Sequence, residues 1–246
     1  MSSRSPAFRR VLDDLGRAVV AGDFPPGHTT SVETLTARTL TSRSIVREAT
    51  RVLAALGMLT ASPRVGLVVR PRPAWNLLDP EVIRWRLQGP DRDAQLEELQ
   101  ELRAAVEPAA AVAAARRISR SGMAQRLLDA ATALEDPAVL ADPTRFLAAD
   151  EELHSAVLEA SGNAMFVRLG AVVSQALEER AEIDPVARDV ELHTTLARAV
   201  AAGDDTTAGA AMGELVARTR DRPRVRRPAA QAGQRSREVT TETRGA

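Results

Sequence analysis

The feature that most constrains the fold is the stretch from Asp91 to about Arg220, in which nearly every segment is compatible with a helix. It is rich in alanine and leucine, has no notable strand pattern, and is interrupted at intervals by residues that end or begin helices. The interruptions predict six or seven helices of about 12 to 28 residues, packed as an antiparallel bundle. They lie at residues 119–122, 136–137, 142–143, 161–163, 184–185 and 203–204.

Length and composition set the outer limits. The chain has 246 residues, of which 44% are hydrophobic, enough for two domains with their own cores. It has no cysteine, which excludes disulfides, thiolate nucleophiles and cysteine-bound zinc. There is no run of about 18 apolar residues, and residues 1–10 lack the apolar core of a signal peptide. The sequence therefore predicts a soluble, cytoplasmic, mainly α protein with no membrane partner.

A different pattern precedes the bundle. Helical periodicity over residues 8–20 stops at GDFPPG, and a second short helix fits residues 32–39. A third helix fits between Ser42, a favourable N-cap, and Gly57, a favourable C-cap. MLTAS, PRVG and LVVR then read as two short strands around a turn. Three helices followed by a hairpin is the order of a winged helix-turn-helix, whose third helix enters the major groove of DNA.

The start of the third helix carries candidate DNA contacts. Arg43 and Arg47 are four residues apart on one face, with Ser44 beside them. A guanidinium group pairs with guanine or with phosphate, and a serine hydroxyl suits either. The alternative is that Arg47 and Glu48 are ordinary charges of an exposed helix surface.

The formal net charge of zero hides an uneven distribution along the chain. Residues 1–72 hold 11 Arg and 5 acidic residues, residues 73–217 hold 13 Arg and 25 acidic residues, and residues 218–246 hold 9 Arg and 3 acidic residues. This asymmetry indicates a basic head suited to a polyanion, an acidic body and a basic tail, although a chance run of solvated charge gives the same count.

The stretch that runs from AGDFPPG through SRSIVREA to the wing PRVGLVVRP resembles the DNA-binding domain of the GntR family of bacterial transcription regulators over residues 8–72. Carried over by position, the resemblance implies DNA contacts at Arg43, Ser44, Arg47, Arg64 and Gly66.

Two residues of this stretch depart from the family pattern. Glu33 stands where the family often offers an arginine to DNA, and a carboxylate there would repel phosphate. Leu40 replaces a glycine that is common in the turn, which suggests a differently built turn. Both make the operator sequence less predictable.

Between head and bundle, the segment RPRPAWNLLDPEVIRWRL begins with prolines that resist helix and then becomes amphipathic. It contains both tryptophans of the chain, Trp75 and Trp85. We expect it to pack between the two domains, with the tryptophans as anchors rather than ligand contacts.

In the bundle, ADEELH places Asp150 and His154 four residues apart on one helix face. This pair is either part of a metal site or two polar residues on a solvated surface. The segments ELRAAVEPAAAVAAARR, FLAADEELHSAVLEASGN and DVELHTTLARAVAAGD resemble the effector domain of the FadR branch of the same family, over residues 92–217. The linker WNLLDPEVIRWRL further resembles the sub-branch that responds to sugar acids such as galactonate or gluconate.

The resemblance implies that one Asp and three His bind a divalent cation, which holds a small organic acid. It places Asp150, His154 and His193 in this set, and such a set suits Zn²⁺, Ni²⁺ or Mn²⁺. The last histidine falls near Leu215, which cannot be a ligand, so either three protein ligands leave open coordination or no metal binds. Asp189, four residues before His193, is a possible substitute.

Two further residues are candidates for the effector. Arg103 is the expected partner of an effector carboxylate, with an i,i+4 salt bridge to Glu107 as the alternative. Asn163 either faces the pocket or caps the next helix.

The expected organisation is a winged helix-turn-helix domain (1–72), a linker (73–91), an all-helical effector-binding and dimerisation domain (92–217) and a disordered basic tail (218–246) that is solvated or adds nonspecific DNA contact. The predicted function is a ligand-controlled repressor that binds palindromic double-stranded DNA as a homodimer and has no catalytic site. Two alternatives remain: a metal-dependent enzyme with Glu151 or Glu152 as general base, and a DNA-binding dimer without an effector. The absence of an HExxH motif or a Gly-rich phosphate loop counts against the enzyme.

Overall fold

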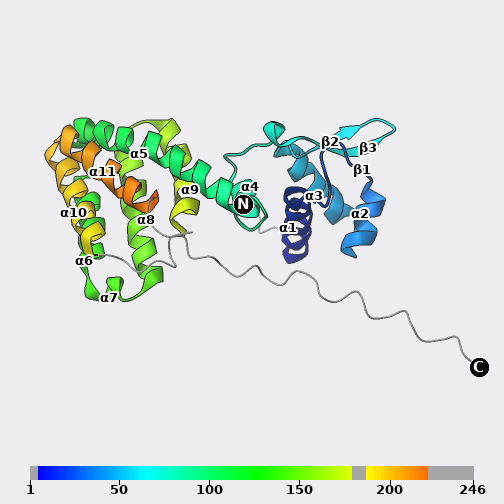
Figure 1. Ribbon diagram of the computed structural model, residues 1–246, viewed down its shortest axis with the longest axis horizontal. Helices are drawn as coiled ribbons and strands as arrows, with labels where there is room; N and C mark the ends of the chain where they lie inside the picture. The colour runs from blue at the N-terminus through cyan, green and yellow to red at the C-terminus, as the bar shows by residue number, and fades with distance from the viewer. Residues whose placement is uncertain (1–4, 179–186, 221–246) are drawn as a thin grey trace, which may run out of the picture.

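The computed structural model describes residues 5–178 and 187–220, which form a head and a helical bundle joined by one short helix (Figure 1). The predicted fold class, mainly α with a winged helix-turn-helix head, is confirmed. The head consists of α1 (Pro6–Ala21), β1 (Thr29–Thr30), α2 (Val32–Thr39), α3 (Arg43–Ala55), β2 (Leu59–Ser62) and β3 (Gly66–Val69). Its core is built from the apolar faces of α1 and α3, with Leu15, Val46 and Leu53 almost fully buried.

Serine side chains begin the three helices of the head. Ser5, Ser31 and Ser42 accept hydrogen bonds from the backbone N–H groups three residues further on, which satisfies donors that have no partner inside the helix. The sheet has the order β1-β3-β2, with both pairs antiparallel. The hairpin β2–β3 was predicted, but β1 was not, because two residues are too short to show an alternating pattern.

Leu40 ends α2 in the left-handed conformation, with φ 51° and ψ 42°, and its side chain is 88% exposed. The backbone therefore adopts the conformation that glycine favours at this position, and the expectation of a differently built turn is wrong. An L side chain in this region costs about 1–2 kcal/mol.

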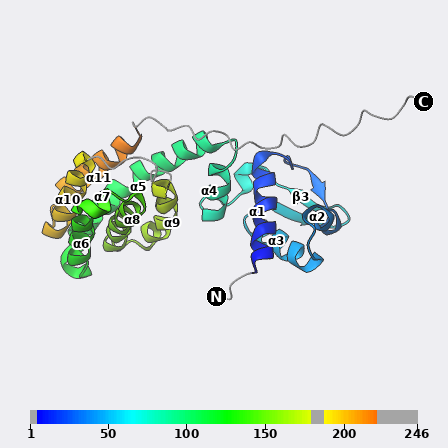
Figure 2. The same ribbon diagram turned by 90° about the horizontal axis from the view of Figure 1, so that it is seen from below.

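The junction between the two parts is formed by the 3₁₀ turn η1 (Arg72–Ala74) and helix α4 (Pro80–Leu87). Trp85 on α4 belongs to the head core, and a Cβ on Gly16 of α1 would lie 2.6 Å from its ring atoms. Ile83 and Leu87, also on α4, belong to a separate apolar cluster with residues of the bundle. Figure 2 shows α4 between the two parts. The helix thus contacts both, as expected for the tryptophan-containing segment.

The bundle contains seven described helices, whose ends match the predicted interruptions, apart from 184–185, which lies outside the described residues. They are α5 (Arg92–Ser121), α6 (Ala124–Glu135), α7 (Pro137–Leu140), α8 (Pro143–Ala160), α9 (Ala164–Glu178), α10 (Ala187–Ala202) and α11 (Asp205–Arg220). The predicted lengths are wrong for α7, which has 4 residues, and for α5, which has 30. Two Asp-Pro starts close together leave room for only one turn between them.

The C-terminal boundary also differs from the prediction. Residues 218–220 belong to α11, where Arg218 pairs with Glu214 one turn earlier at 2.7 Å, and not to the tail. The rest of the predicted disordered tail, residues 221–246, lies outside the described residues. Within residues 5–178 and 187–220, no helix is long and apolar enough to cross a membrane.

Candidate functional site

The bundle holds a cluster of buried charged and polar side chains on α8 and α10. Asp150 and His154 come from α8 and His193 from α10, and each is at most 2% exposed. One ligand atom of each of the three lies within 4.8 Å of the others. The expectation that His193 joins the pair on α8 is therefore met in space, and the pair does not lie on a solvated surface.

Both imidazoles point the same nitrogen at the Asp150 carboxylate. The Nε2 atoms of His193 and His154 lie 2.8 Å and 3.5 Å from Asp150 Oδ1. The other ring nitrogen of His193, Nδ1, donates to the backbone carbonyl of Asp189 at 2.5 Å. Because a carbonyl oxygen only accepts, Nδ1 carries the hydrogen of this bond, and Nε2 is the ring atom that faces the carboxylate.

His154 is oriented by a residue on a third helix. Its Nδ1 lies 2.5 Å from Oε2 of Glu107 on α5, and the other Glu107 oxygen accepts a hydrogen bond from Arg103 Nε at 2.6 Å. Arg103 and Glu107 are each 1% exposed. The i,i+4 salt bridge that was one reading of Arg103 is thus present, but Glu107 has a second partner that the sequence did not reveal. The sequence signal that could have indicated this second contact is the presence of two opposite charges, Arg103 and Glu107, in an alanine-rich helix.

The charges in this cluster shift one another's pKa values. Burial raises the pKa of Glu107, but the positive charges of Arg103 and His154 lower it to about 2. Burial lowers the pKa of His154, but Glu107 and Asp150 raise it to about 9. The pKa of Asp150 is well below its ordinary value, because its contacts with the two histidines outweigh burial.

The residues present fit a divalent metal ion with three protein ligands. Both histidines have Nδ1 held by an acceptor, which leaves Nε2 as the ligand atom, an arrangement common around metal sites. Leu215, at the expected fourth position, is buried in the apolar core of the bundle. Asp189 is not part of the cluster that the described residues form, and its backbone carbonyl orients His193 instead.

The remaining candidates of the bundle have other contacts. Asn163 Oδ1 accepts a hydrogen bond from the backbone N–H of Met165 at 2.9 Å, so the side chain caps α9 and the pocket reading is not supported. Glu152, nominated as a general base, pairs at the surface with Arg126 at 2.5 Å, and Glu151 is only partly buried.

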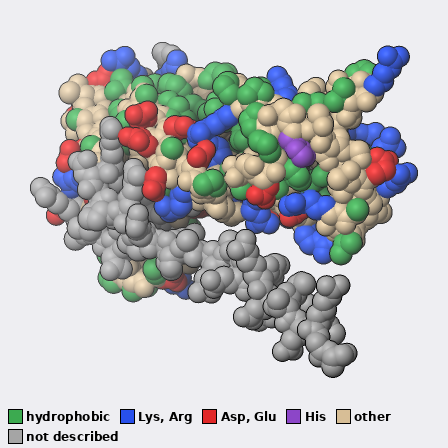
Figure 3. Space-filling model, turned by 45° about the vertical axis from the view of Figure 1, so that its right-hand side comes forward, with side chains coloured by type: hydrophobic (Ala, Val, Ile, Leu, Met, Phe, Trp, Pro, Cys, Tyr) green, Lys and Arg blue, Asp and Glu red, His purple; other side chains and the backbone are tan. Residues whose placement is uncertain are grey.

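The first turn of α3 faces solvent. Arg43, Ser44 and Arg47 are exposed, whereas Val46 and Ala49 on the opposite face are fully buried. Arg43 Nη2 donates to Glu33 Oε1 on α2 at 2.8 Å, so the carboxylate expected to repel phosphate is paired with an arginine. Figure 3 shows basic side chains gathered on the head and acidic ones on the bundle.

The wing extends from the head as the turn between β2 and β3. Arg64 is exposed there and adopts a positive φ of 66°. Gly66 has φ 100°, and a Cβ at this position would lie 2.6 Å from the carbonyl oxygen of Thr30. Glycine is therefore required for β3 to approach β1, independently of any DNA contact.

A solvent-facing helix with arginines at its start, next to a basic wing, places the protein in the class of winged helix-turn-helix DNA-binding proteins. Residues 8–69 match the family described as "Bacterial regulatory proteins, gntR family", and residues 98–218 match the FCD domain. The galactonate operon transcriptional repressor of Escherichia coli (strain K12) is 34% identical over 167 residues, which are 67% of this chain and 71% of that protein. The chain therefore belongs to the gntR family and is a transcription regulator with an FCD domain.

Solved structures share the fold. Streptococcus agalactiae GntR is 24% identical, with a TM-score of 0.51, over 87% of this chain and 100% of that one. A second solved structure is described as "Lar controls the expression of the Listeria monocytogenes agr system and mediates virulence". It is 18% identical, with a TM-score of 0.57, over 89% of this chain and 96% of that one. The matching domains and relatives are those of regulators rather than enzymes, which removes support for the enzyme alternative.

Proposed function

We propose that the protein is a repressor that binds a palindromic operator on double-stranded DNA as a homodimer, in the cytoplasm, and releases it when a small carboxylic or sugar acid binds in the bundle. The relative that represses a galactonate operon supports both the sign of regulation and the class of effector. A single head offers a short recognition surface, which is why two half-sites are expected.

The observation that carries the proposal is the state of Arg103. Its Nη1 and Nη2 atoms are buried and, within the described part of the chain, have no hydrogen-bond partner, although Nε is paired with Glu107. Leaving buried charged donors unpaired is costly. An effector carboxylate would accept from both nitrogens, in the bidentate geometry that a guanidinium favours.

Asp150, His154 and His193 would hold a divalent metal ion, Zn²⁺, Ni²⁺ or Mn²⁺, beside this arginine. A bound ion would supply a Lewis acid for an oxygen of the effector. Glu107 contacts both Arg103 and His154, so the metal site and the carboxylate site belong to one buried network. Both sites therefore favour an acid as the effector.

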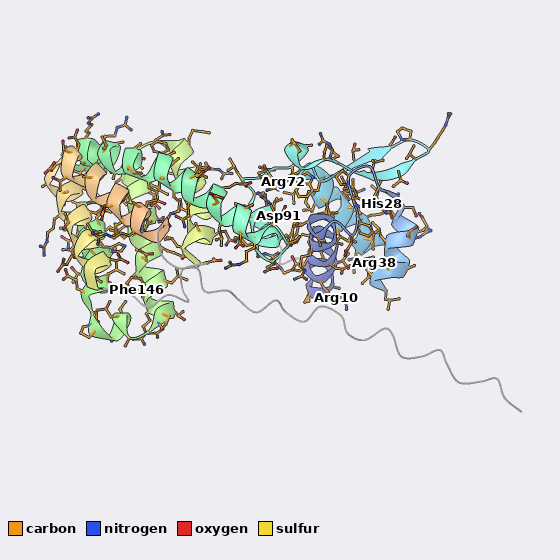
Figure 4. All side chains as sticks on the ribbon, viewed as in Figure 1. Arg10, His28, Arg38, Arg72, Asp91 and Phe146 are labelled. Atoms are coloured by element: carbon orange, nitrogen blue, oxygen red, sulfur yellow. The ribbon has the colours of Figure 1, made fainter. Side chains whose placement is uncertain are left out.

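Helix α5 connects this site with the segment that joins the bundle to the head. It carries Arg103 and Glu107, and nearer its start Glu98 accepts from Arg86 of α4 at 2.7 Å and from Arg72 of η1 at 3.0 Å. Arg72 also pairs with Asp91 at 2.9 Å, and Figure 4 shows these two residues side by side between the two parts. A change in the position of α5 would thus reach α4, which packs on the head.

The test begins with selection of the fragments of genomic DNA that the protein binds. Binding to the selected operator is then measured in the presence of a panel of carboxylic and sugar acids that includes galactonate and gluconate, each with and without Zn²⁺, Ni²⁺ or Mn²⁺. We expect at least one acid to weaken operator binding, and Arg103→Gln to abolish the response. Arg116→Gln, on the exposed side of the same helix, is the matched control. Release of DNA by an acid from metal-free protein would contradict the role of the metal. No response to any acid, in a protein that selects DNA, would favour the effector-independent dimer.

The proposed role of α3 in DNA binding is tested separately, by measuring operator affinity. Arg43→Ala and Arg47→Ala should each weaken operator binding by about 1–3 kcal/mol if they contact bases. Unchanged affinity of both variants would contradict the assignment of α3 as the recognition helix. Sedimentation of the protein alone and on the selected operator gives the number of chains bound.

A further inference from the structure

The pair between Glu33 and Arg43 links two helices at the DNA-facing side of the head. Glu33 lies in the first turn of α2 and Arg43 is the first residue of α3. The two side chains are 61% and 67% exposed. An exposed ion pair of this kind contributes little to folding stability. We therefore consider its effect on how Arg43 binds DNA.

Glu33 follows the N-cap residue of α2 by two positions. The pKa of its carboxyl is lowered first by a hydrogen bond from its own backbone N–H, then by the Ser31 side chain, and further by the charges of Arg43 and Arg47. Ser31 in turn caps α2. The carboxylate lies in the first turn of a helix, where a negative charge is favourable, and from there it offers Oε1 to Arg43.

A carboxylate paired with an arginine changes how that arginine binds DNA. An unpaired guanidinium on a flexible side chain binds any phosphate within reach, which adds affinity for every sequence. When one carboxylate oxygen accepts from Nη2 of Arg43, part of the positive charge is neutralised and the group is restricted to positions that keep this contact. The remaining N–H groups are still able to donate to a planar pair of acceptors such as guanine O6 and N7.

We propose that Glu33 is a specificity-determining residue of the DNA interface, which positions Arg43 for one base pair and reduces its binding to phosphates. This inference rests on the proposed DNA-binding role of α3. Glu33 acts through Arg43, so it is a positioning residue and not itself a base contact.

The experiment compares wild type with Glu33→Gln, Arg43→Ala and the control Glu48→Gln, which removes one exposed negative charge from α3. Each protein is used for selection from a random duplex library, and its affinity for a mixed-sequence duplex without a selected site is measured at several salt concentrations. For Glu33→Gln we expect several-fold tighter binding to the mixed duplex and a slope of log K against log salt that is steeper by about 0.9, equivalent to one further phosphate contact. We also expect it to lose base preference at the same position that Arg43→Ala loses.

Equal slopes and identical selected sequences for Glu33→Gln and Glu48→Gln would overturn the inference while leaving the proposed function intact. A wild-type protein that selects no sequence, or an Arg43→Ala variant with the wild-type sequence preference, would overturn the role of α3 and the inference with it. A circular dichroism spectrum and melting temperature equal to those of wild type show that each variant is folded.

Discussion

Glu107 offers the sharpest test of the buried network, because replacing it with glutamine removes a charge at nearly constant volume. Glu107 has two buried cationic partners, Arg103 at 2.6 Å and His154 at 2.5 Å. Glutamine has one acceptor oxygen and one donor nitrogen, so only one of these partners keeps an acceptor. Removing one member of a buried ion pair typically costs about 3–5 kcal/mol, and the retained hydrogen bond places Glu107→Gln near 3 kcal/mol of lost unfolding free energy.

Metal binding should weaken as well, since Glu107 holds the Nδ1 side of His154. Loss of such an orienting partner typically reduces metal affinity by about 10- to 100-fold, which corresponds to about 1.4–2.7 kcal/mol. Urea denaturation of metal-free protein measures the first effect, and competition for Zn²⁺ with a chromophoric chelator measures the second. Glu101→Gln, on the exposed face of α5, is the control and should change neither.

Wild-type Zn²⁺ affinity in Glu107→Gln, together with a loss in His154→Ala, would refute the orienting role of Glu107 while keeping His154 as a ligand. Unchanged stability would refute the inference that Glu107 compensates the buried charge of Arg103.

Three other predictions concern single features. Leu40→Gly should raise the unfolding free energy by up to about 1 kcal/mol in urea denaturation, because relief of the left-handed strain exceeds the added freedom of the unfolded chain, and a loss of stability would show that the exposed side chain has a structural role. Gly16→Ala should lower stability by about 1–3 kcal/mol and alter tryptophan fluorescence, because the new methyl group meets the ring of Trp85, and a stabilised variant would contradict this packing. At pH 7, binding of one Zn²⁺ should release about one proton, because the pKa of metal-free His154 is about 9, and affinity should rise with pH up to that value. Calorimetry in buffers of different ionisation enthalpy measures this release, and its absence would show that the ion does not displace the His154 proton.

Local signals along the chain were sufficient for much of the fold. Ser42 begins α3, Gly66 allows the wing, and the Asp-Pro pairs at 136–137 and 142–143 begin helices, because each acts through hydrogen bonds or backbone conformation within a few residues. The same holds for Asp150 and His154, whose i,i+4 spacing guarantees a shared face once the segment is helical. Leu40 is the exception, since the sequence showed a missing glycine but not that the turn keeps the glycine conformation.

The sequence by itself determined the order of the elements, the basic head and the acidic body, and the residue types available at each candidate site. Only the tertiary structure decided which side chains meet across elements: Glu107 with His154, and Glu33 with Arg43. These contacts depend on how helices far apart in the chain pack against one another. Packing depends on the combined shape of many apolar side chains, whereas helix starts and turns depend on a few neighbouring residues.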